Sequence, residues 1–212
     1  MTAVLFDLDG TLVDSSKGIV NAFTHTFETL NVSPPDITTL STYIGPPLET
    51  TFLDYFNESS KVEEAIKHFR AYYKKSGVYQ VHLYNEIKEL LISLLDLNYD
   101  LYVTTSKHQP MAEIMLEELK ISSYFKKIYG SEKERFLKVD VIKACLIENQ
   151  IKPNEAIIVG DTKFDMIGGQ EAGINTLGVT WGFGTQDDLL ANGANLIANT
   201  PSDVLSLLSI KS

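Results

Sequence analysis

A short apolar run that ends abruptly in acidic residues constrains this chain more than any other feature. The run extends from Ala3 to Phe6, and Asp7, Asp9 and Gly10 follow it at once. A continuous apolar run bounded by a polar turn is typical of a strand that is buried on both faces. The sequence therefore predicts a buried first strand with two carboxylates just beyond its carboxyl end.

Similar runs recur along the chain and alternate with helical patterns. Four further strands are predicted, at residues 101–103, 156–159, 174–179 and 196–198. Helical patterns occur before and between them, in residues 87–95, 111–119, 141–146 and 165–171. Strands that alternate with helices favour right-handed crossovers and a mainly parallel sheet. The predicted fold class is therefore α/β, with a Rossmann-like sheet core.

Residues 14–84 have a different pattern from the rest of the chain. Aromatic and apolar residues recur there at helical spacing, no convincing strand is present, and the pairs Pro34-Pro35 and Pro46-Pro47 interrupt the segment. We predict an all-helical cap in residues 14–84, inserted after the first strand of an α/β core made of residues 1–13 and 85–212. A chain of 212 residues is long enough for a main domain with such an insertion.

Charge and apolar pattern exclude several classes of function. The formal net charge is −10, which disfavours general binding to nucleic acid or to anionic membranes. No apolar run reaches the roughly 18 residues of a membrane-spanning helix, and the first ten residues lack the basic start of a signal peptide. Cys145 is the only cysteine, so we expect a buried thiol and no internal disulfide. We expect a cytoplasmic protein, monomeric or homodimeric, without nucleic-acid or membrane partners.

Polar side chains follow three of the predicted strands, and the carboxyl ends of parallel strands meet at one edge of an open sheet. In chain order they are Asp7 and Asp9, Thr105 and Ser106, and Asp161 and Asp165. Lys138 opens the helix before the strand at 156–159 and can reach the same edge. Each of these residues alone is explained as a helix cap, a turn residue or a solvated lysine. The complete set in this order favours an active site.

Four of these residues have the chemistry of a magnesium site. Mg²⁺ prefers hard oxygen ligands and keeps some of its water. The carboxylates of Asp7, Asp161 and Asp165 and the backbone carbonyl of Asp9 can supply such oxygens. We therefore expect Mg²⁺ as the cofactor.

The same set can transfer a phosphoryl group. With its charge compensated by Mg²⁺ and Lys138, an Asp7 oxygen can attack phosphorus and form an aspartyl phosphate. Asp9 can protonate the leaving alcohol and afterwards activate water. Thr105, Ser106 and Lys138 can bind the phosphoryl oxygens.

These residues resemble the motifs of the haloacid dehalogenase superfamily over nearly the whole chain. The stretch from Asp7 to Thr11 is similar to its first phosphatase motif, Asp-x-Asp-Gly-Thr, and residues 160–165 are similar to its fourth, Gly-Asp-x-x-x-Asp. Thr105 is similar to the Thr or Ser of the second motif. Lys138 is similar to the lysine of the third; Lys133 is an alternative, but Lys138 better fits a position just before a helix.

The resemblance narrows the reaction class. Dehalogenases, phosphonatases and transport ATPases of this superfamily lack the second Asp of the first motif, so Asp9 implies a phosphatase or a phosphomutase. Sugar phosphomutases with a similar cap have a histidine at the position of Ile19, which implies water as the final acceptor here. The inserted segment resembles the helical cap of the phosphoglycolate phosphatase-like branch. By that resemblance the loop at residues 43–49, with Gly45, faces the substrate; a plain helix-to-helix turn is the alternative.

Two functions of different class remain open. The first is a magnesium-dependent phosphatase that acts on a small phosphorylated metabolite, such as phosphoglycolate or, in the manner of a 5'-nucleotidase, a nucleoside monophosphate. The second is a phosphate-sensing regulatory protein with weak turnover. The intact set of Asp7, Asp9, Thr105, Lys138 and Asp161 favours the first.

Overall fold

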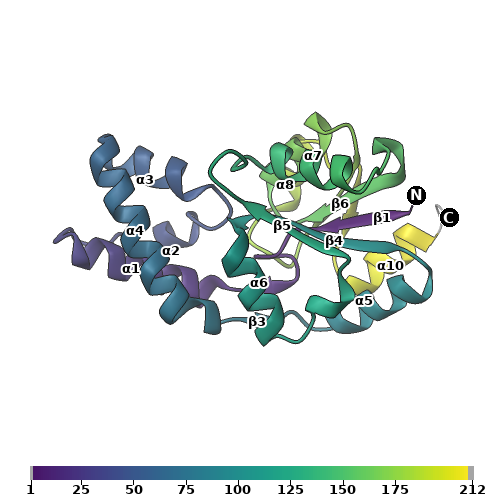
Figure 1. Cartoon of the computed structure of the whole chain (residues 1–212), viewed down its shortest axis with the longest axis horizontal. Coiled ribbons are helices and arrows are strands. Elements are labelled where there is room, and N and C mark those ends of the chain that lie inside the picture. The colour runs from purple at the N-terminus through teal and green to yellow at the C-terminus, as the bar shows by residue number, and fades with distance from the viewer. Residues whose placement is uncertain (1, 210–212) are drawn as a thin grey trace.

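The computed structural model describes residues 2–209 and has a six-stranded parallel sheet at its centre (Figure 1). In the order β5-β4-β1-β6-β7-β8, every neighbouring pair of strands is parallel. The strands are β1 (Ala3–Phe6), β4 (Asp100–His108), β5 (Lys127–Ser131), β6 (Ala156–Gly160), β7 (Asn175–Val179) and β8 (Leu196–Ala198). Ala3 of β1 pairs with Asp100 on one side and with Ala156 on the other. The α/β class predicted from the apolar runs is confirmed.

Side chains of β1 alternate between two cores, one on each face of the sheet. Val4 and Phe6 belong to the larger core, and Ala3 and Leu5 belong to the smaller one, which also contains the buried Cys145. On the side of the smaller core lie α7 (Lys138–Glu148) and α8 (Lys163–Glu171). The opposite face is covered by α5 (Ile87–Asp96), α6 (Gln109–Glu118) and α10 (Pro201–Ser209) (Figure 1). The shorter helices of the core are η2 (Ser122–Tyr124), η3 (Pro153–Glu155) and α9 (Gln186–Ala191).

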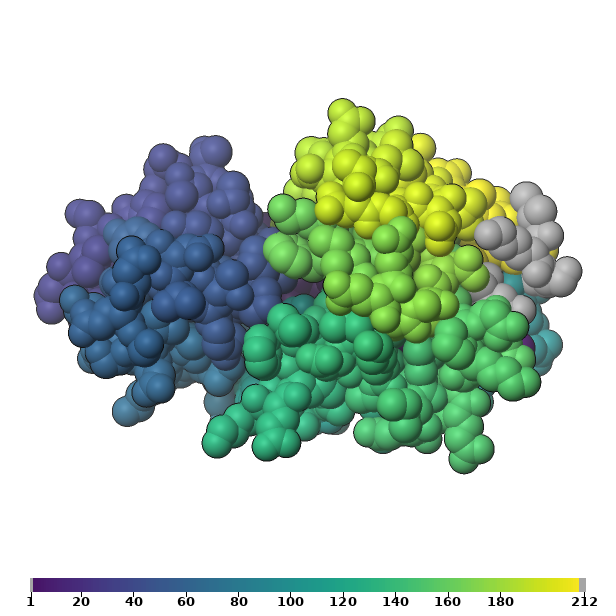
Figure 2. Space-filling view, turned by 90° about the horizontal axis from the view of Figure 1, so that it is seen from above, coloured from purple at the N-terminus to yellow at the C-terminus, as the bar shows by residue number. Residues whose placement is uncertain are grey.

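Four helices form the cap, which stands beside the sheet as a separate block (Figures 1 and 2). They are α1 (Ser16–Thr29), α2 (Ile37–Ser41), α3 (Leu48–Phe56) and α4 (Ser59–Lys75), with the 3-10 helix η1 (Gly77–Tyr79) after them. Aromatic rings fill the interior of the cap. The ring centroids of Phe23, Phe52 and Phe69 lie 4.7, 5.3 and 6.3 Å apart. The aromatic residues at helical spacing therefore mark the packed side of the cap helices, and the helical insertion is confirmed.

A two-stranded antiparallel ribbon joins the cap to the core. It pairs β2 (Val13–Asp14) with β3 (His82–Leu83). The prediction that residues 14–84 contain no strand is therefore wrong at both ends of that segment. Two residues are too few to show the alternation that identifies a strand in a sequence. Because both connections to the cap run through this ribbon, it determines where the cap sits at the edge of the sheet.

The sequence also does not predict β5. Only Ile128 and Tyr129 are apolar in this strand before Gly130, so no apolar run marks it. Its strand geometry comes from pairing with β4 along residues 102–104. The other five strands of the sheet match the predicted runs, and β4 extends past its run to His108. Within residues 2–209, no helix is long and apolar enough to cross a membrane.

Candidate active site

A cavity of about 100 Å³ lies between the cap and the carboxyl edge of the sheet. Seven of the predicted site residues line it: Asp7, Asp9, Gly45, Thr105, Ser106, Lys138 and Asp165. The eighth, Asp161, is fully buried and contacts this group through its carboxylate. The structure thus brings together residues that are up to 158 positions apart, between Asp7 and Asp165, at one place.

The turn after β1 places the first two carboxylates. The Asp7 amide donates to the Val159 carbonyl of β6 at 2.9 Å, which holds the turn against the neighbouring strand. Gly10 then adopts a left-handed conformation, with φ of +85°. A Cβ atom at Gly10 would lie 2.1 Å from Oδ2 of Asp161, so only glycine lets the two loops approach this closely.

Lys138, the first residue of α7, connects the first and fourth motifs. Its Nζ lies 2.6 Å from Oδ1 of Asp7 and 2.6 Å from Oδ1 of Asp165, and it donates to the Thr104 carbonyl at 2.9 Å. Burial by itself lowers the pKa of Lys138, but the charges of Asp165 and Asp7 outweigh burial and raise it. The ammonium is therefore a fixed positive charge beside the predicted nucleophile.

Three buried carboxylates form a cluster, and two of them contact this ammonium. Asp7, Asp161 and Asp165 each place a carboxylate oxygen within 4.8 Å of the others. Burial raises the pKa of Asp7 to about 7, with Asp165 adding to the shift and Lys138 opposing it. Burial, Asp165 and Asp7 raise the pKa of Asp161 well above its usual range. One ammonium among three carboxylates leaves an excess of negative charge, so the residues present fit a bound divalent cation.

The two aspartates of the fourth motif have different partners. Asp161 accepts from the Thr11 hydroxyl at 3.0 Å and from the Phe183 amide at 2.8 Å. Asp165 is the third residue of α8 and accepts at Oδ2 from the amide and hydroxyl of Thr162, the N-cap residue of that helix. Its Oδ1 is paired with Lys138. Both aspartates use both oxygens, but only Asp165 is paired with a cation, whereas the donors to Asp161 are neutral. The charge of Asp161 is therefore left for a metal ion, and Asp165 suits an anchor for Lys138.

Asp9 is held by two side chains that the sequence did not single out. Its Oδ1 accepts from the Ser15 hydroxyl at 2.5 Å, and its Oδ2 lies 2.8 Å from Nζ of Lys107. Lys107 also donates to the Tyr73 hydroxyl of the cap at 3.0 Å. Lys107 stands two residues after Thr105, so its place beside the second motif was the signal available; the contact with Tyr73 depends on how the cap docks.

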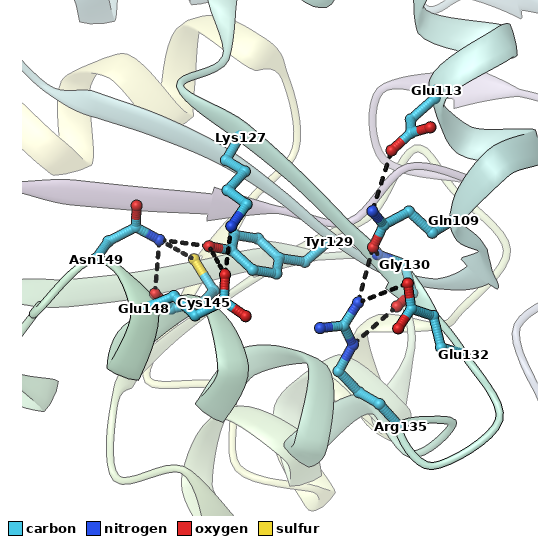
Figure 3. Close-up of polar contacts among 10 residues, drawn as sticks. All are labelled: Gln109, Glu113, Lys127, Tyr129, Gly130, Glu132, Arg135, Cys145, Glu148 and Asn149. Carbon is cyan, nitrogen blue, oxygen red and sulfur yellow. Dashed lines mark hydrogen bonds and ion pairs between the residues drawn. The ribbon is translucent and has the colours of Figure 1, made fainter.

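The loop before Lys138 is tied down by Arg135 (Figure 3). The guanidinium donates to Gln109 Oε1 at 2.7 Å and to the Gly130 carbonyl at 3.3 Å, and it pairs with Glu132 at 3.5 Å. Lys133, the alternative for the third motif, is exposed in this loop, while Lys138 is buried in the site.

Figure 3 also shows Cys145 on the far side of Tyr129, where burial raises the pKa of the thiol to about 12 and makes it unreactive.

A parallel sheet that gathers buried aspartates and a lysine at its carboxyl edge, beneath a helical cap, defines a capped Rossmann-like α/β protein with an aspartate-based site. Residues 4–179 match the family model described as haloacid dehalogenase-like hydrolase. A solved haloacid dehalogenase-like hydrolase from Streptococcus pneumoniae superposes with a TM-score of 0.92, at 47% identity over 98% of both chains.

Two curated relatives carry more specific names. The chain is 33% identical to a 5'-nucleotidase from Pseudomonas aeruginosa, over 89% of this chain and 87% of that protein. It is 30% identical to the pyrophosphatase PpaX from Bacillus cereus, over 99% and 97%. The chain therefore belongs to the haloacid dehalogenase-like hydrolase family, and it is an enzyme of the phosphatase group within that family.

Proposed function

We propose that the chain hydrolyses small phosphate monoesters in two steps, through a phosphoryl group carried by Asp7 and with Mg²⁺ bound. One observation carries the proposal: Lys138 pairs with the buried Asp7 at 2.6 Å, in a cavity that also contains Asp9. A second, independent carboxylate beside the nucleophile is what hydrolysis through a covalent intermediate requires.

The metal would be held mainly by Asp7 and Asp161, together with the backbone carbonyl of Asp9. Bound there, Mg²⁺ would supply charge compensation for the nucleophile and the phosphoryl oxygens. Asp165 would act through Lys138, because its charge is already compensated by that ammonium, while Asp161 accepts only from neutral donors. This division explains why one motif contributes two aspartates with different surroundings.

In the first step, an Asp7 carboxylate oxygen attacks phosphorus and the bond from phosphorus to the ester oxygen breaks. Asp9 gives its proton to that oxygen, so the leaving group departs as an alcohol. Lys138 balances the negative charge of the nucleophile. The Thr105 hydroxyl accepts from the Lys107 amide at 3.2 Å, and its own proton is then available to a phosphoryl oxygen. Ser106 provides a second hydroxyl on the same wall of the cavity.

In the second step, water attacks phosphorus and the bond from phosphorus to Asp7 breaks. Asp9 takes the proton from that water, which restores the starting state and releases inorganic phosphate. Ser15 and Lys107 hold the two oxygens of Asp9 in place for both transfers. Ile19 lines the cavity with an apolar side chain, so the cap offers no hydrogen-bonding group there for a sugar acceptor.

The size of the cavity supports a small leaving group. A volume of about 100 Å³ is below the roughly 300–1,000 Å³ of pockets that hold drug-sized ligands. We therefore place a compact ester, in the manner of phosphoglycolate, ahead of a nucleoside monophosphate. A nucleoside monophosphate stays an alternative substrate because one relative is a 5'-nucleotidase. A purely phosphate-sensing role is disfavoured because the nucleophile, its acid/base partner and its counter-charge all lie in one cavity.

The test is hydrolysis of p-nitrophenyl phosphate with Mg²⁺, with Mg²⁺ removed by a chelator, and by variants. Wild-type turnover should be lost on chelation and in Asp7→Asn. Asp54→Asn is the matched control, because Asp54 is exposed on α3 of the cap and the chemical change is the same. Undiminished turnover in Asp7→Asn would contradict the proposal.

A further inference from the structure

The cap contributes one cation to the cavity. Among the described lining residues that come from the cap, most are apolar or aromatic, and the charged ones are Glu49 of α3 and Arg70 of α4. The chemistry described above uses neither of them. Since the phosphoryl group is bound by the core, groups on the cap wall contact the leaving group.

Arg70 is only partly paired. Its Nη2 donates to Oε1 of Glu49 at 3.0 Å, while its Nε is buried and has no hydrogen-bond partner among the described residues. A guanidinium keeps its proton and its five donors under all ordinary conditions. A buried charged donor without an acceptor is costly, and an acceptor on the ligand would remove that cost.

The contact with Glu49 shows what kind of group Arg70 binds. Glu49 is a carboxylate on the cavity wall, and its pair with Arg70 is roughly half exposed on both sides, with 41% and 47% of the side chains accessible. Exposed pairs of this kind contribute little to stability, about 0–1 kcal/mol. A stronger, more enclosed anion can therefore replace Glu49 on Arg70.

The core wall of the cavity favours the same kind of ligand. His108, at the end of β4, lines the cavity, and its pKa is lowered by burial and by the positive charge of Arg70. The positive charge of Arg70 on the cap therefore acts on a side chain of the core. A neutral His108 can still donate one hydrogen bond to an anion held at Arg70.

We propose that Arg70 binds a second anionic group, a carboxylate or a phosphate, on the leaving group of the substrate. The proposal rests on the phosphatase activity proposed above, and it makes the enzyme selective for short phosphate esters that carry an anion at both ends. Lys138 and Arg70 would then bind the two anionic groups of one compact substrate from opposite walls of a small cavity.

The test compares substrates that differ in this second anion. The Mg²⁺-loaded enzyme is assayed with 2-phosphoglycolate and pyrophosphate, which have one, and with ethyl phosphate and p-nitrophenyl phosphate, which do not. Arg70→Gln should lower kcat/KM for at least one of the first two by about 10- to 100-fold, mainly through KM, as expected for a lost charge-assisted hydrogen bond. It should change the last two less than about threefold. Loss with phosphoglycolate alone assigns the site to carboxylate, and loss with pyrophosphate alone assigns it to phosphate.

Two further variants sharpen the result. Lys67→Gln removes a positive charge from an exposed position of the same helix and should leave all four substrates unchanged. Glu49→Gln should lower KM for the substrate with a second anionic group, because the competing carboxylate is gone. An equal loss for all substrates in Arg70→Gln, or no loss for any, would overturn the proposal.

A binding measurement separates this proposal from the proposed function. Asp7→Asn protein with Mg²⁺ is titrated with 2-phosphoglycolate and pyrophosphate in a calorimeter, with and without Arg70→Gln. Weaker binding of at least one ligand in the double variant supports the site at Arg70 even if wild type turns over no ester. If the single and the double variant bind each ligand with the same affinity, the proposal is overturned even if the wild-type enzyme is an active phosphatase.

Discussion

At the scale of single residues, the site depends on one ammonium shared between two carboxylates. Lys138 is the only partner of opposite charge that the described residues give to Asp7 and Asp165 within 4 Å. Breaking a buried pair by removing one partner typically costs 3–5 kcal/mol, because the other charge stays buried without compensation. Lys138 should therefore matter for both folding and catalysis.

Lys138→Met is expected to lower turnover of p-nitrophenyl phosphate by at least about 100-fold and to lower the unfolding temperature. Lys133→Met is the matched control, since Lys133 is exposed and five residues away in the sequence. It should stay within about threefold of wild type. Near-normal activity of a folded Lys138→Met protein, judged by circular dichroism, would show that the third motif is misassigned.

The raised pKa of Asp7 predicts how the metal-free protein responds to pH. The value is about 7 in the fold against 3.8 for the free side chain, so the folded state binds the proton more tightly. Asp7 therefore adds to the free energy of unfolding at low pH. This contribution, at most about 4 kcal/mol, is lost as pH rises from the free value to the value in the fold. With a chelator present, Asp7→Asn should therefore become more stable than wild type as pH rises from 5 to 8, in thermal unfolding. A difference that does not depend on pH would contradict this.

The sequence identifies residues whose role follows from their own chemistry. The carboxylates, Thr105, Lys138 and the glycine after Asp9 all stand at strand or helix ends that apolar patterns reveal. Lys107, Tyr73 and Arg70 were not assigned to the site, because an isolated lysine, tyrosine or arginine on a helix or strand end has an ordinary solvated explanation. Their roles come from the docking of the cap on the core, which no local pattern encodes.

At the scale of elements, what the sequence predicts depends on burial. Strands buried on both faces, such as β1 and β6, appear as apolar runs, and the acidic residues that follow them lie at the cavity beneath the cap. The edge strand β5 and the ribbon of β2 and β3 do not appear, because pairing with other elements makes them strands. The ribbon matters most for function, since it connects the cap that carries Tyr73 and Arg70 to the core that carries Asp7.

The cap loop at Gly45 offers a test at this scale. Gly45 has φ of +108°, and a Cβ there would lie 3.2 Å from Cγ2 of Thr162, where the cap loop meets the start of α8. Gly45→Ala should cost about 1–3 kcal/mol and displace the loop, lowering kcat/KM by about tenfold. Gly173→Ala is the control: its φ is +76°, and its nearest neighbour would be Pro153 at an ordinary 3.8 Å. It should lower the unfolding temperature and leave kcat/KM unchanged; equal kinetic effects would remove the cap loop from the site.

At the scale of the whole molecule, charge is distributed unevenly. The chain has a formal net charge of −10, yet Arg70, Lys107 and Lys138 all line one cavity. Asp7, Asp9, Glu49 and Asp165 line the same cavity, so a bound divalent cation is needed before the cavity favours a small anion. The expectation of no nucleic-acid partner follows from the net charge and, like the monomer-or-homodimer and cytoplasmic expectations, stays a prediction.

The central claim is that Asp7 carries the phosphoryl group. Asp9→Asn should trap it, because an aryl phosphate needs little acid help to leave, while the attacking water then lacks its base. The measurement is mass spectrometry of Asp9→Asn protein quenched in acid after mixing with p-nitrophenyl phosphate and Mg²⁺. The predicted result is one phosphoryl group on the peptide that contains Asp7. This group should be absent in the double variant that also carries Asp7→Asn. An unmodified Asp7 peptide during continuing turnover, or a phosphoryl group on another residue, would contradict the account.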